Sequence, residues 1–220
     1  MARIVITGAN RGIGFELARQ LFARGDEVVA ACRSASPELK ALKVEIHQGV
    51  DVTDEPSVRG LARTLAGKPV DILINNAGIL SHETLDDLDL DRIRRQFEVN
   101  ALGPLRVTAA LLGSLKRGSK VAIVTSRMGS LAHNTSGGSY GYRASKAAAN
   151  IIGISLAHDL KPRGIAVVLL HPGWVKTEMT GGSGTTGPAD AAARLIARID
   201  ELTLEHTGEF RHAEGYALPW

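Results

Sequence analysis

Short apolar runs that alternate with helical patterns constrain the fold of this chain more than any other feature. Several runs are apolar at consecutive positions, as in Val70–Asn75, and do not alternate between apolar and polar residues. Strands covered on both faces of a parallel sheet have this pattern. Between the runs, Ile13, Leu17 and Leu21 recur every four residues, which is a helical spacing. The candidate strands are Arg3–Thr7, Glu27–Cys32, Val44–Gly49, Val70–Asn75, Lys120–Thr125 and Ile165–Leu170.

This alternation predicts an α/β fold built on a doubly wound parallel sheet of about seven strands, with helices on both faces. The chain has 220 residues, of which 44% are apolar, and it contains no repeat, long linker or block of charge. We therefore expect one domain over residues 1–220. No run of apolar residues is long enough to span a membrane.

Composition also bears on compartment and partners. A single cysteine, Cys32, cannot form an internal disulfide, and the first residues do not resemble a signal peptide, so a cytoplasmic location is expected. The formal net charge is +3 and aromatic residues make up 4% of the chain. Because the basic residues are scattered, we expect a small-molecule partner and neither nucleic acid nor membrane.

A glycine-rich loop, Thr7–Gly14, follows the first predicted strand. Gly8 would allow a tight turn, Gly12 would let the backbone approach a pyrophosphate, and Gly14 would let the next helix pack closely on the strand. The free N–H groups and the positive dipole end of that helix attract phosphate. The segment is interpreted as the dinucleotide-binding loop of a Rossmann-like sheet.

Two arginines indicate which dinucleotide binds. Folds that prefer NAD usually carry an acid about 20 residues beyond the glycine loop. That window holds Cys32, Arg33 and Ser34, and Arg11 lies within the loop itself. Guanidinium groups bind an adenosine 2′-phosphate, whereas a carboxylate would repel it. The sequence therefore favours NADP(H) over NAD(H), although both arginines could instead be solvated surface residues.

Tyr142 and Lys146 are four residues apart and occupy one face of a predicted helix. A free phenol has a pKa of about 10 and is a poor acid or base at neutral pH. An ammonium group about 4 Å away would lower that pKa by about three units at an effective dielectric of about 20. The pair is a candidate acid–base centre. Tyr140 has no lysine at this spacing.

Several motifs follow one another in a fixed order along nearly the whole chain. They are Thr7–Gly14, Asp51–Val52, Asn75–Gly78, Asn100, Ser126, Tyr142 with Lys146, and His171–Thr177. With these motifs the chain resembles a short-chain dehydrogenase/reductase of the compact, single-domain type. A long loop before Tyr142 and the segment Gly208–Trp220 resemble the branch that contains the C-factor signalling protein and sniffer-type carbonyl reductases.

The resemblance implies a role for each candidate catalytic residue. Tyr142 would give a proton to a substrate carbonyl oxygen in reduction, or accept one in oxidation, and Ser126 would stabilise that oxygen. Lys146 would hold the nicotinamide ribose and lower the tyrosine pKa. Asn100 would position a water that connects Lys146 to solvent.

The resemblance also implies a cofactor site and a substrate loop at about 176–188. Asp51 and Val52 would contact adenine, Asn76 to Gly78 the adjacent ribose, and Pro172 to Thr177 the nicotinamide amide. The expected cofactor-binding residues are Gly8, Asn10, Arg11, Gly12, Ile13, Gly14, Arg33, Asp51, Val52, Asn76, Ala77, Gly78, Tyr142, Lys146, Pro172, Gly173, Val175 and Thr177.

Some assignments have rivals. Ser126 and Tyr142 are farther apart than is common in the family, so four other hydroxyls compete for the serine's role. Ser126 is preferred because it directly follows an apolar strand. The rivals are Thr125, Ser130, Ser136 and Ser139. Guesses for substrate-pocket neighbours, from loop position alone, are Leu131, His133, Trp174 and Met179.

No metal site is expected. Four aspartates lie close together, but leucines between them indicate the solvated face of a helical approach. They are Asp86, Asp87, Asp89 and Asp91. His171 is interpreted as a loop histidine whose hydrogen bonds are satisfied.

Two functions stay open. One is NADP(H)-dependent reduction of a ketone or aldehyde to an alcohol, reversible in principle; the other is an NADP-binding signalling protein of C-factor type with little turnover. A nucleotide-sugar epimerase is disfavoured, because those relatives have a differently spaced glycine loop and a further substrate domain. Family members commonly form homodimers or homotetramers through two long central helices, expected here at Asn100–Lys116 and Tyr142–Lys161.

Overall fold

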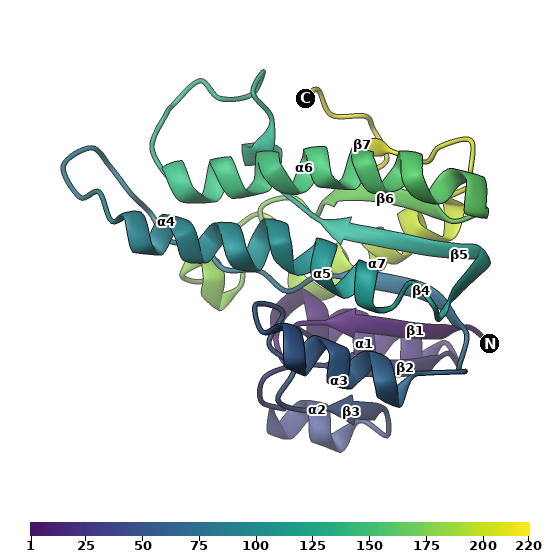
Figure 1. Cartoon of the computed structure of the whole chain (residues 1–220). Coiled ribbons are helices and arrows are strands. Elements are labelled where there is room, and N and C mark those ends of the chain that lie inside the picture. The colour runs from purple at the N-terminus through teal and green to yellow at the C-terminus, as the bar shows by residue number, and fades with distance from the viewer.

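The computed structural model describes residues 1–220 and contains a sheet of seven parallel strands (Figure 1). Their order across the sheet is β3-β2-β1-β4-β5-β6-β7. The strands are β1 (Arg3–Thr7), β2 (Glu27–Ala31), β3 (Glu45–His47), β4 (Val70–Asn75), β5 (Leu115–Val124), β6 (Ala166–His171) and β7 (Glu209–His212). This confirms the predicted doubly wound parallel sheet.

Seven α-helices connect the strands and cover both faces of the sheet (Figure 1). They are α1 (Gly12–Ala23), α2 (Pro37–Ala41), α3 (Glu55–Thr64), α4 (Leu90–Phe97), α5 (Gly103–Ala110), α6 (Tyr140–Leu160) and α7 (Pro188–Glu201). None of them combines the length and the apolar composition that a membrane span requires.

Two hydrophobic cores explain the continuous apolar runs. In β1, Ile4 and Ile6 pack into the core beneath α1 and α7, while Val5 between them packs into the core beneath α3, α5 and α6. All three side chains are fully buried. Because successive side chains of a strand point to opposite faces, a sheet covered on both sides requires apolar residues at every position.

The order of the strands creates the crevice on which function depends. From β1 the chain moves outward to β2 and β3, and from β4 it moves in the opposite direction to β5, β6 and β7. β1 and β4 are neighbours, with Ile4 aligned with Ile72 and Ile6 with Ile74. The loops that follow these two strands therefore diverge, and ligands of open α/β sheets bind at such a point.

The predicted helix Asn100–Lys116 is wrong at both ends. Helix α4 already starts at Leu90, because the Asp89 carboxylate accepts hydrogen bonds from the N–H groups of Asp91 and Arg92 and caps the helix. A π-helical turn, Glu98–Leu102, joins α4 to α5, which lies beside α6 (Figure 1). Residues beyond Ala110 turn into β5.

Some strand boundaries also differ from expectation. β3 is shorter than Val44–Gly49, and β5 starts five residues before Lys120. β7 is absent from the candidate strands, because it has only four residues and just two of them, Phe210 and His212, are buried. It forms at the edge of the sheet, where β6 provides the pairing partner.

A loop packs very closely on α6 at Gly129, in the 3-10 turn after β5. A Cβ atom there would lie 2.6 Å from the carbonyl carbon of Lys146 and 2.8 Å from the nitrogen of Ala147. Both are backbone atoms, so neither can rotate away. The loop and α6 approach this closely only with glycine at this position.

We expect Gly129→Ala to lower the free energy of unfolding by about 1–3 kcal/mol, because the added methyl group overpacks a rigid contact. Gly113→Ala is the control, since a Cβ at Gly113 meets no atom within 4 Å. Urea denaturation of both variants measures the effect. Equal midpoints for the two variants would contradict the prediction.

Candidate active site

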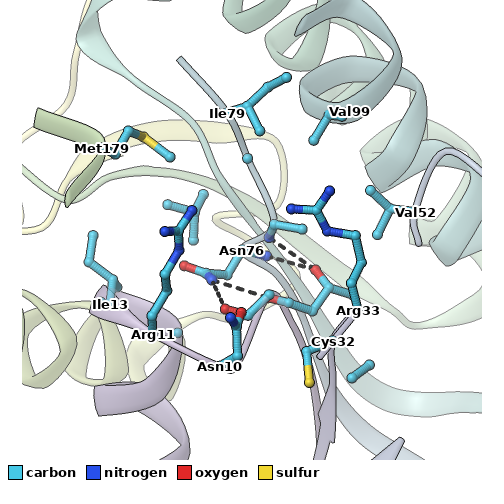
Figure 2. Close-up of a pocket in the computed structure, with 18 of the residues that line it drawn as sticks. Asn10, Arg11, Ile13, Cys32, Arg33, Val52, Asn76, Ile79, Val99 and Met179 are labelled. Atoms are coloured by element: carbon cyan, nitrogen blue, oxygen red, sulfur yellow. Dashed lines mark hydrogen bonds between the residues drawn. The ribbon is translucent and has the colours of Figure 1, made fainter. Parts of the chain in front are cut away.

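A cavity of about 1010 Å³ lies at the carboxyl edge of the sheet, where the chain diverges from β1 and β4 (Figure 2). Its wall includes the ends of β1, β2, β4 and β5, the start of α1 and the start of α6. Thirty residues line it. Those expected from the sequence are Gly8, Asn10, Arg11, Gly12, Ile13, Gly14, Arg33, Asp51, Val52, Asn76, Ala77, Gly78, Tyr142, Lys146, Pro172 and Thr177.

The glycine loop has the conformation that its sequence requires. Gly8 and Gly12 have φ values of 66° and 54°, in the left-handed region that favours glycine. A Cβ on Gly14 would lie 2.2 Å from the carbonyl oxygen of Gly8, so a larger residue would break the turn. Above Gly12 the nearest atom is the Thr177 methyl carbon, 3.5 Å from where a Cβ would stand. The loop therefore presents bare backbone to the cavity.

The N-terminus of α1 has no capping side chain and no acid in its first turn. In contrast, Ser36, Asp54 and Asp89 cap α2, α3 and α4. The first N–H groups of α1 belong to residues that line the cavity. Unpaired N–H groups and a positive dipole end at a glycine cradle fit the pyrophosphate of a dinucleotide.

Hydrogen bonds connect the loop after β1 to the loop after β4 (Figure 2). The Asn76 side-chain amide donates to the carbonyl oxygens of Thr7, at 3.1 Å, and Gly8, at 3.2 Å. The Thr7 hydroxyl accepts from the N–H groups of Asn76 and Ala77, both at 3.1 Å. The amide nitrogen of Asn76 thus holds the glycine loop in place. The Thr7 hydroxyl, which no motif marked in the sequence, fixes the start of the loop after β4.

Arg11 and Arg33 extend into the cavity from opposite sides (Figure 2). Arg11 pairs with Glu178, which belongs to the loop after β6. Arg33 forms no ion pair within 4 Å, and its guanidinium group lies near Val52 and Val99 (Figure 2). Of the two arginines, only Arg33 lacks a carboxylate partner.

Asp51 is ionised at neutral pH. Burial alone would raise its pKa, but hydrogen bonds from the Thr53 N–H and hydroxyl groups, at 2.9 and 2.8 Å, and the charges of Arg33 and Arg95 keep the pKa below its usual value. Because the charge of Arg33 acts on this carboxylate and both residues line the cavity, they lie in the same part of it. This part therefore contains both signs of charge.

Tyr142 and Lys146 both line the cavity from the first two turns of α6. The Lys146 ammonium donates to the carbonyl oxygen of Val124 at 2.9 Å and lies 5.8 Å from the centre of the Tyr142 ring. Burial lowers the pKa of Lys146 to about 8. The two side chains share one helix face, as their spacing predicts.

The expected lowering of the tyrosine pKa does not occur in this structure. Burial raises the pKa of Tyr142 above its usual value, and a hydrogen bond with Ser126 offsets only part of that rise. The phenol loses more solvation than the lysine compensates, because the ammonium group is directed at a backbone carbonyl. Tyr142 is therefore a protonated phenol at neutral pH.

Ser126 is the hydroxyl that pairs with Tyr142. It caps the 3-10 turn Arg127–Gly129, where its oxygen accepts from the Met128 N–H at 3.1 Å. The four rivals are engaged elsewhere: Thr125 donates to Asn150, Ser130 accepts from the His133 N–H, Ser136 accepts from Arg143, and Ser139 contacts His82. Ser126 is therefore the hydroxyl beside Tyr142, but it does not line the cavity, whereas Thr125 does.

Asn100 is buried in the π-helical turn and does not line the cavity. Its side chain donates to the Ile79 carbonyl at 2.9 Å and to the Ser145 hydroxyl at 3.0 Å, and accepts from the Ile79 N–H at 2.9 Å. It lies near Lys146: a Cβ on Gly78 would be 3.2 Å from the Asn100 oxygen and 3.7 Å from the Lys146 nitrogen. Asn100 thus holds the loop after β4 against α6.

The segment after β6 contributes fewer residues than expected. Pro172 and Thr177 line the cavity, whereas Gly173 and Val175 do not. Val175 is buried and bridges to Thr186, which closes the expected substrate loop on itself. Of the guessed substrate-pocket neighbours, Met179 lines the cavity, and Leu131, His133 and Trp174 do not.

One structural interpretation needs correction. His171 is the last residue of β6 and not a loop residue, and its buried Nδ1 atom has no hydrogen-bond partner. Burial, followed by the charges of His212 and Arg127, lowers its pKa to about 3, so the ring is neutral. The aspartate cluster runs into the first turn of α4, and most of its members are exposed, as a solvated face requires. Asp89 caps the helix, and three of the four aspartates pair with Arg92 or Arg94.

One wall of the cavity, formed by α4 and the π-helical turn, was not predicted from the sequence. Arg95, Glu98 and Val99 line the cavity there. Their positions depend on how α4 packs over the loop after β4, and no motif marks them. The only available signal is that Arg95 and Val99 are four residues apart in a helical segment.

Comparisons with known proteins agree with this geometry. The family described as short chain dehydrogenase matches residues 2–186. The chain is 46% identical to a 1-hydroxy-2-glutathionyl-2-methyl-3-butene dehydrogenase of Rhodococcus sp. strain AD45, over 100% of both proteins. It is 48% identical to C-signal of Myxococcus xanthus, over 74% of this chain and 100% of that protein.

A solved structure, the NADPH-bound carbonyl reductase from chicken fatty liver, superposes with a TM-score of 0.91 at 27% identity, covering 100% of this chain and 99% of that one. The relatives thus include a C-signal and a carbonyl reductase, as the branch-level resemblance predicts. The protein shares its fold with this carbonyl reductase, belongs to the short-chain dehydrogenase family and is an oxidoreductase.

Proposed function

We propose that the protein is an NADP(H)-dependent oxidoreductase that interconverts a ketone or aldehyde and the corresponding alcohol. One observation carries the proposal: Tyr142, whose hydroxyl hydrogen-bonds with Ser126, lines together with Lys146 the same cavity as the glycine cradle. When bound there, the nicotinamide supplies or accepts the hydride. The protein supplies orientation and proton transfer.

The proton is held at the Tyr142 hydroxyl. Because its pKa is raised, the phenol is protonated at neutral pH and is in the state that a general acid requires. It donates this proton to the oxygen of the substrate carbonyl, and the Ser126 hydroxyl stabilises the charge that develops on that oxygen. In the reverse direction the phenolate must form first, so oxidation requires a higher pH.

Lys146 would bind the ribose of the nicotinamide half. An ammonium group has three donors, and the Val124 carbonyl takes one of them. With a pKa of about 8, the group is mostly charged at pH 7. Asn100 would keep the loop after β4 beside Lys146 and position a water for proton relay.

The adenosine half would lie between β2 and the loop after β4. Support for NADP(H) over NAD(H) comes from Arg33, which has no ion-pair partner and stands where NAD-binding folds usually carry an acid. The chicken carbonyl reductase, with a closely similar fold, binds NADPH. The remaining expected cofactor residues surround the same cavity.

The similarity to the dehydrogenase of Rhodococcus supports one substrate class for a first test. The name of that dehydrogenase describes an alcohol that carries a glutathionyl group, and the two chains align over their full length. A hydroxy thioether of glutathione therefore belongs in the first substrate panel, with simple ketones, aldehydes and alcohols beside it. We expect a cytoplasmic homodimer or homotetramer that acts as one domain on such small molecules.

The second candidate is an NADP-binding signalling protein with little turnover. The similarity to C-signal over the full length of that protein favours it. Binding a nucleotide does not by itself require the Ser126–Tyr142 pair, so we rank catalysis first. Turnover of any carbonyl compound in an NADPH-oxidation screen separates the two candidates.

Tyr142→Phe removes the acid–base hydroxyl and should lower kcat by about 100- to 10,000-fold while NADPH binding is kept. Tyr140→Phe is the matched control, because Tyr140 lies in the same turn of α6 but does not line the cavity. Absorbance of NADPH gives turnover, and its fluorescence gives binding. Unchanged turnover of Tyr142→Phe would remove the acid–base assignment.

Arg33→Asp should shift the cofactor preference toward NADH, because a carboxylate repels the 2′-phosphate and accepts hydrogen bonds from the ribose hydroxyls. We expect the ratio of kcat/KM for NADPH to that for NADH to fall by at least about tenfold. Arg59→Asp on α3, which makes the same change in charge outside the cavity, is the control. An unaltered ratio would show that another group holds the phosphate.

Lys146→Met should stabilise the protein at pH 7 by about 1–3 kcal/mol, since it removes a buried ammonium group. The folded pKa of about 8 is below the unfolded value of 10.5, so the penalty is complete below pH 8 and is lost as the pH rises to 10.5. The increase in Tm of Lys146→Met over the parent protein should therefore become smaller as the pH rises from about 8 to 10.5. A variant that is less stable than the parent at pH 7 would contradict this.

A further inference from the structure

Arg95 is the one arginine of α4 that has no structural partner. Helix α4 contains three arginines. Arg92 pairs with Asp89 at 2.9 Å, and Arg94 pairs with Asp91 at 2.6 Å. Arg95 forms no ion pair and no side-chain hydrogen bond, yet it lines the cavity. Its guanidinium group is therefore available to a ligand.

Arg95 lies at the adenosine end of the cavity. The charges of Arg95 and Arg33 both lower the pKa of Asp51, and all three residues line the cavity, so both guanidinium groups are near the same carboxylate. Val99, also on the cavity wall, follows Arg95 by about one helical turn, and Figure 2 shows Val99 near Arg33 and Val52. Arg33 reaches this end from the loop after β2, and Arg95 reaches it from α4.

The balance of charge shows why a second arginine matters. Arg11 is paired with Glu178, and Glu98 with Arg106 at 3.2 Å. Among the remaining groups at the adenosine end, the ionised Asp51 offsets one positive charge. With Arg33 alone this end would be neutral, and with Arg95 it is positive. A phosphate monoester carries a charge of about −1.5 to −2 at pH 7 and requires such an excess.

We propose that Arg95 is a second specificity-determining residue for the cofactor, and that it binds the adenosine 2′-phosphate together with Arg33. The proposal rests on the proposed NADP(H) dependence of this site. The preference for the phosphorylated cofactor would then depend on two segments, the loop after β2 and helix α4, which lie on either side of the crevice. Asp51 can then stay ionised for its own contacts, because the two guanidinium groups outweigh it.

Binding of two fragments to the cofactor-free protein tests the proposal without turnover. Isothermal titration calorimetry would compare 2′,5′-ADP, which carries the 2′-phosphate, with 5′-AMP, which lacks it. The variants are Arg95→Gln and Arg33→Gln, with Arg94→Gln as the matched control one position away on α4. We expect Arg95→Gln to weaken 2′,5′-ADP by about tenfold and 5′-AMP by less than about twofold. Arg94→Gln should change neither.

The outcomes separate this proposal from the proposed function. If Arg33→Gln weakens 2′,5′-ADP and Arg95→Gln does not, the role of Arg95 is overturned and the NADP(H) preference stands. If Arg95→Gln weakens both fragments equally, Arg95 contacts the nucleoside and the phosphate assignment is wrong. If the parent protein binds both fragments equally well, the NADP(H) preference fails, and the role of Arg95 fails with it.

Discussion

The hydrogen bonds between the loops after β1 and β4 hold together the point where the sheet divides. The Asn76 amide and the Thr7 hydroxyl connect two segments about 70 residues apart in the sequence, and they do so through backbone groups. A Cβ on Gly14 would also touch the Asn76 nitrogen, at 2.5 Å. The glycine cradle, the uncapped start of α1 and the wall formed by Gly78 all depend on this connection. Without it, the crevice would have no fixed shape to present to a dinucleotide.

The local sequence pattern was sufficient to predict an element wherever the fold permits only one kind of residue at each position. β1 could be located because Ile4, Val5 and Ile6 must all be apolar beneath helices on both faces. The glycine loop could be located because the left-handed turn at Gly8 and the contact at Gly14 exclude other residues. The helix expected at Asn100–Lys116 was misplaced, because the helical segment starts earlier, at the cap by Asp89, and a π-helical turn divides it into α4 and α5. Neither leaves a periodic signal in the sequence.

Most of the residues that line the candidate site could be predicted from the sequence, but the pKa values of Tyr142 and Lys146 could not. The four-residue spacing of Tyr142 and Lys146 determines that they share a helix face, but burial and partners are tertiary properties. Lys146 is directed toward the Val124 carbonyl, and desolvation dominates the pKa of both groups. Arg95 could not be predicted for a related reason. What distinguishes it from Arg92 and Arg94 is the lack of a partner, which only the folded chain reveals.

The ion pair between Arg11 and Glu178 has a consequence for biosynthesis. The two residues are 167 positions apart, so the glycine loop leaves the ribosome long before the segment that covers it. At about 5–20 residues per second, the delay is about 8–33 s. The exposed pair contributes little energy by itself. Its position nevertheless shows that the nucleotide cleft is completed only after most of the polypeptide has been translated. Until then, a nascent chain contains the glycine loop without the segment around Glu178 that lines the other side of the cavity.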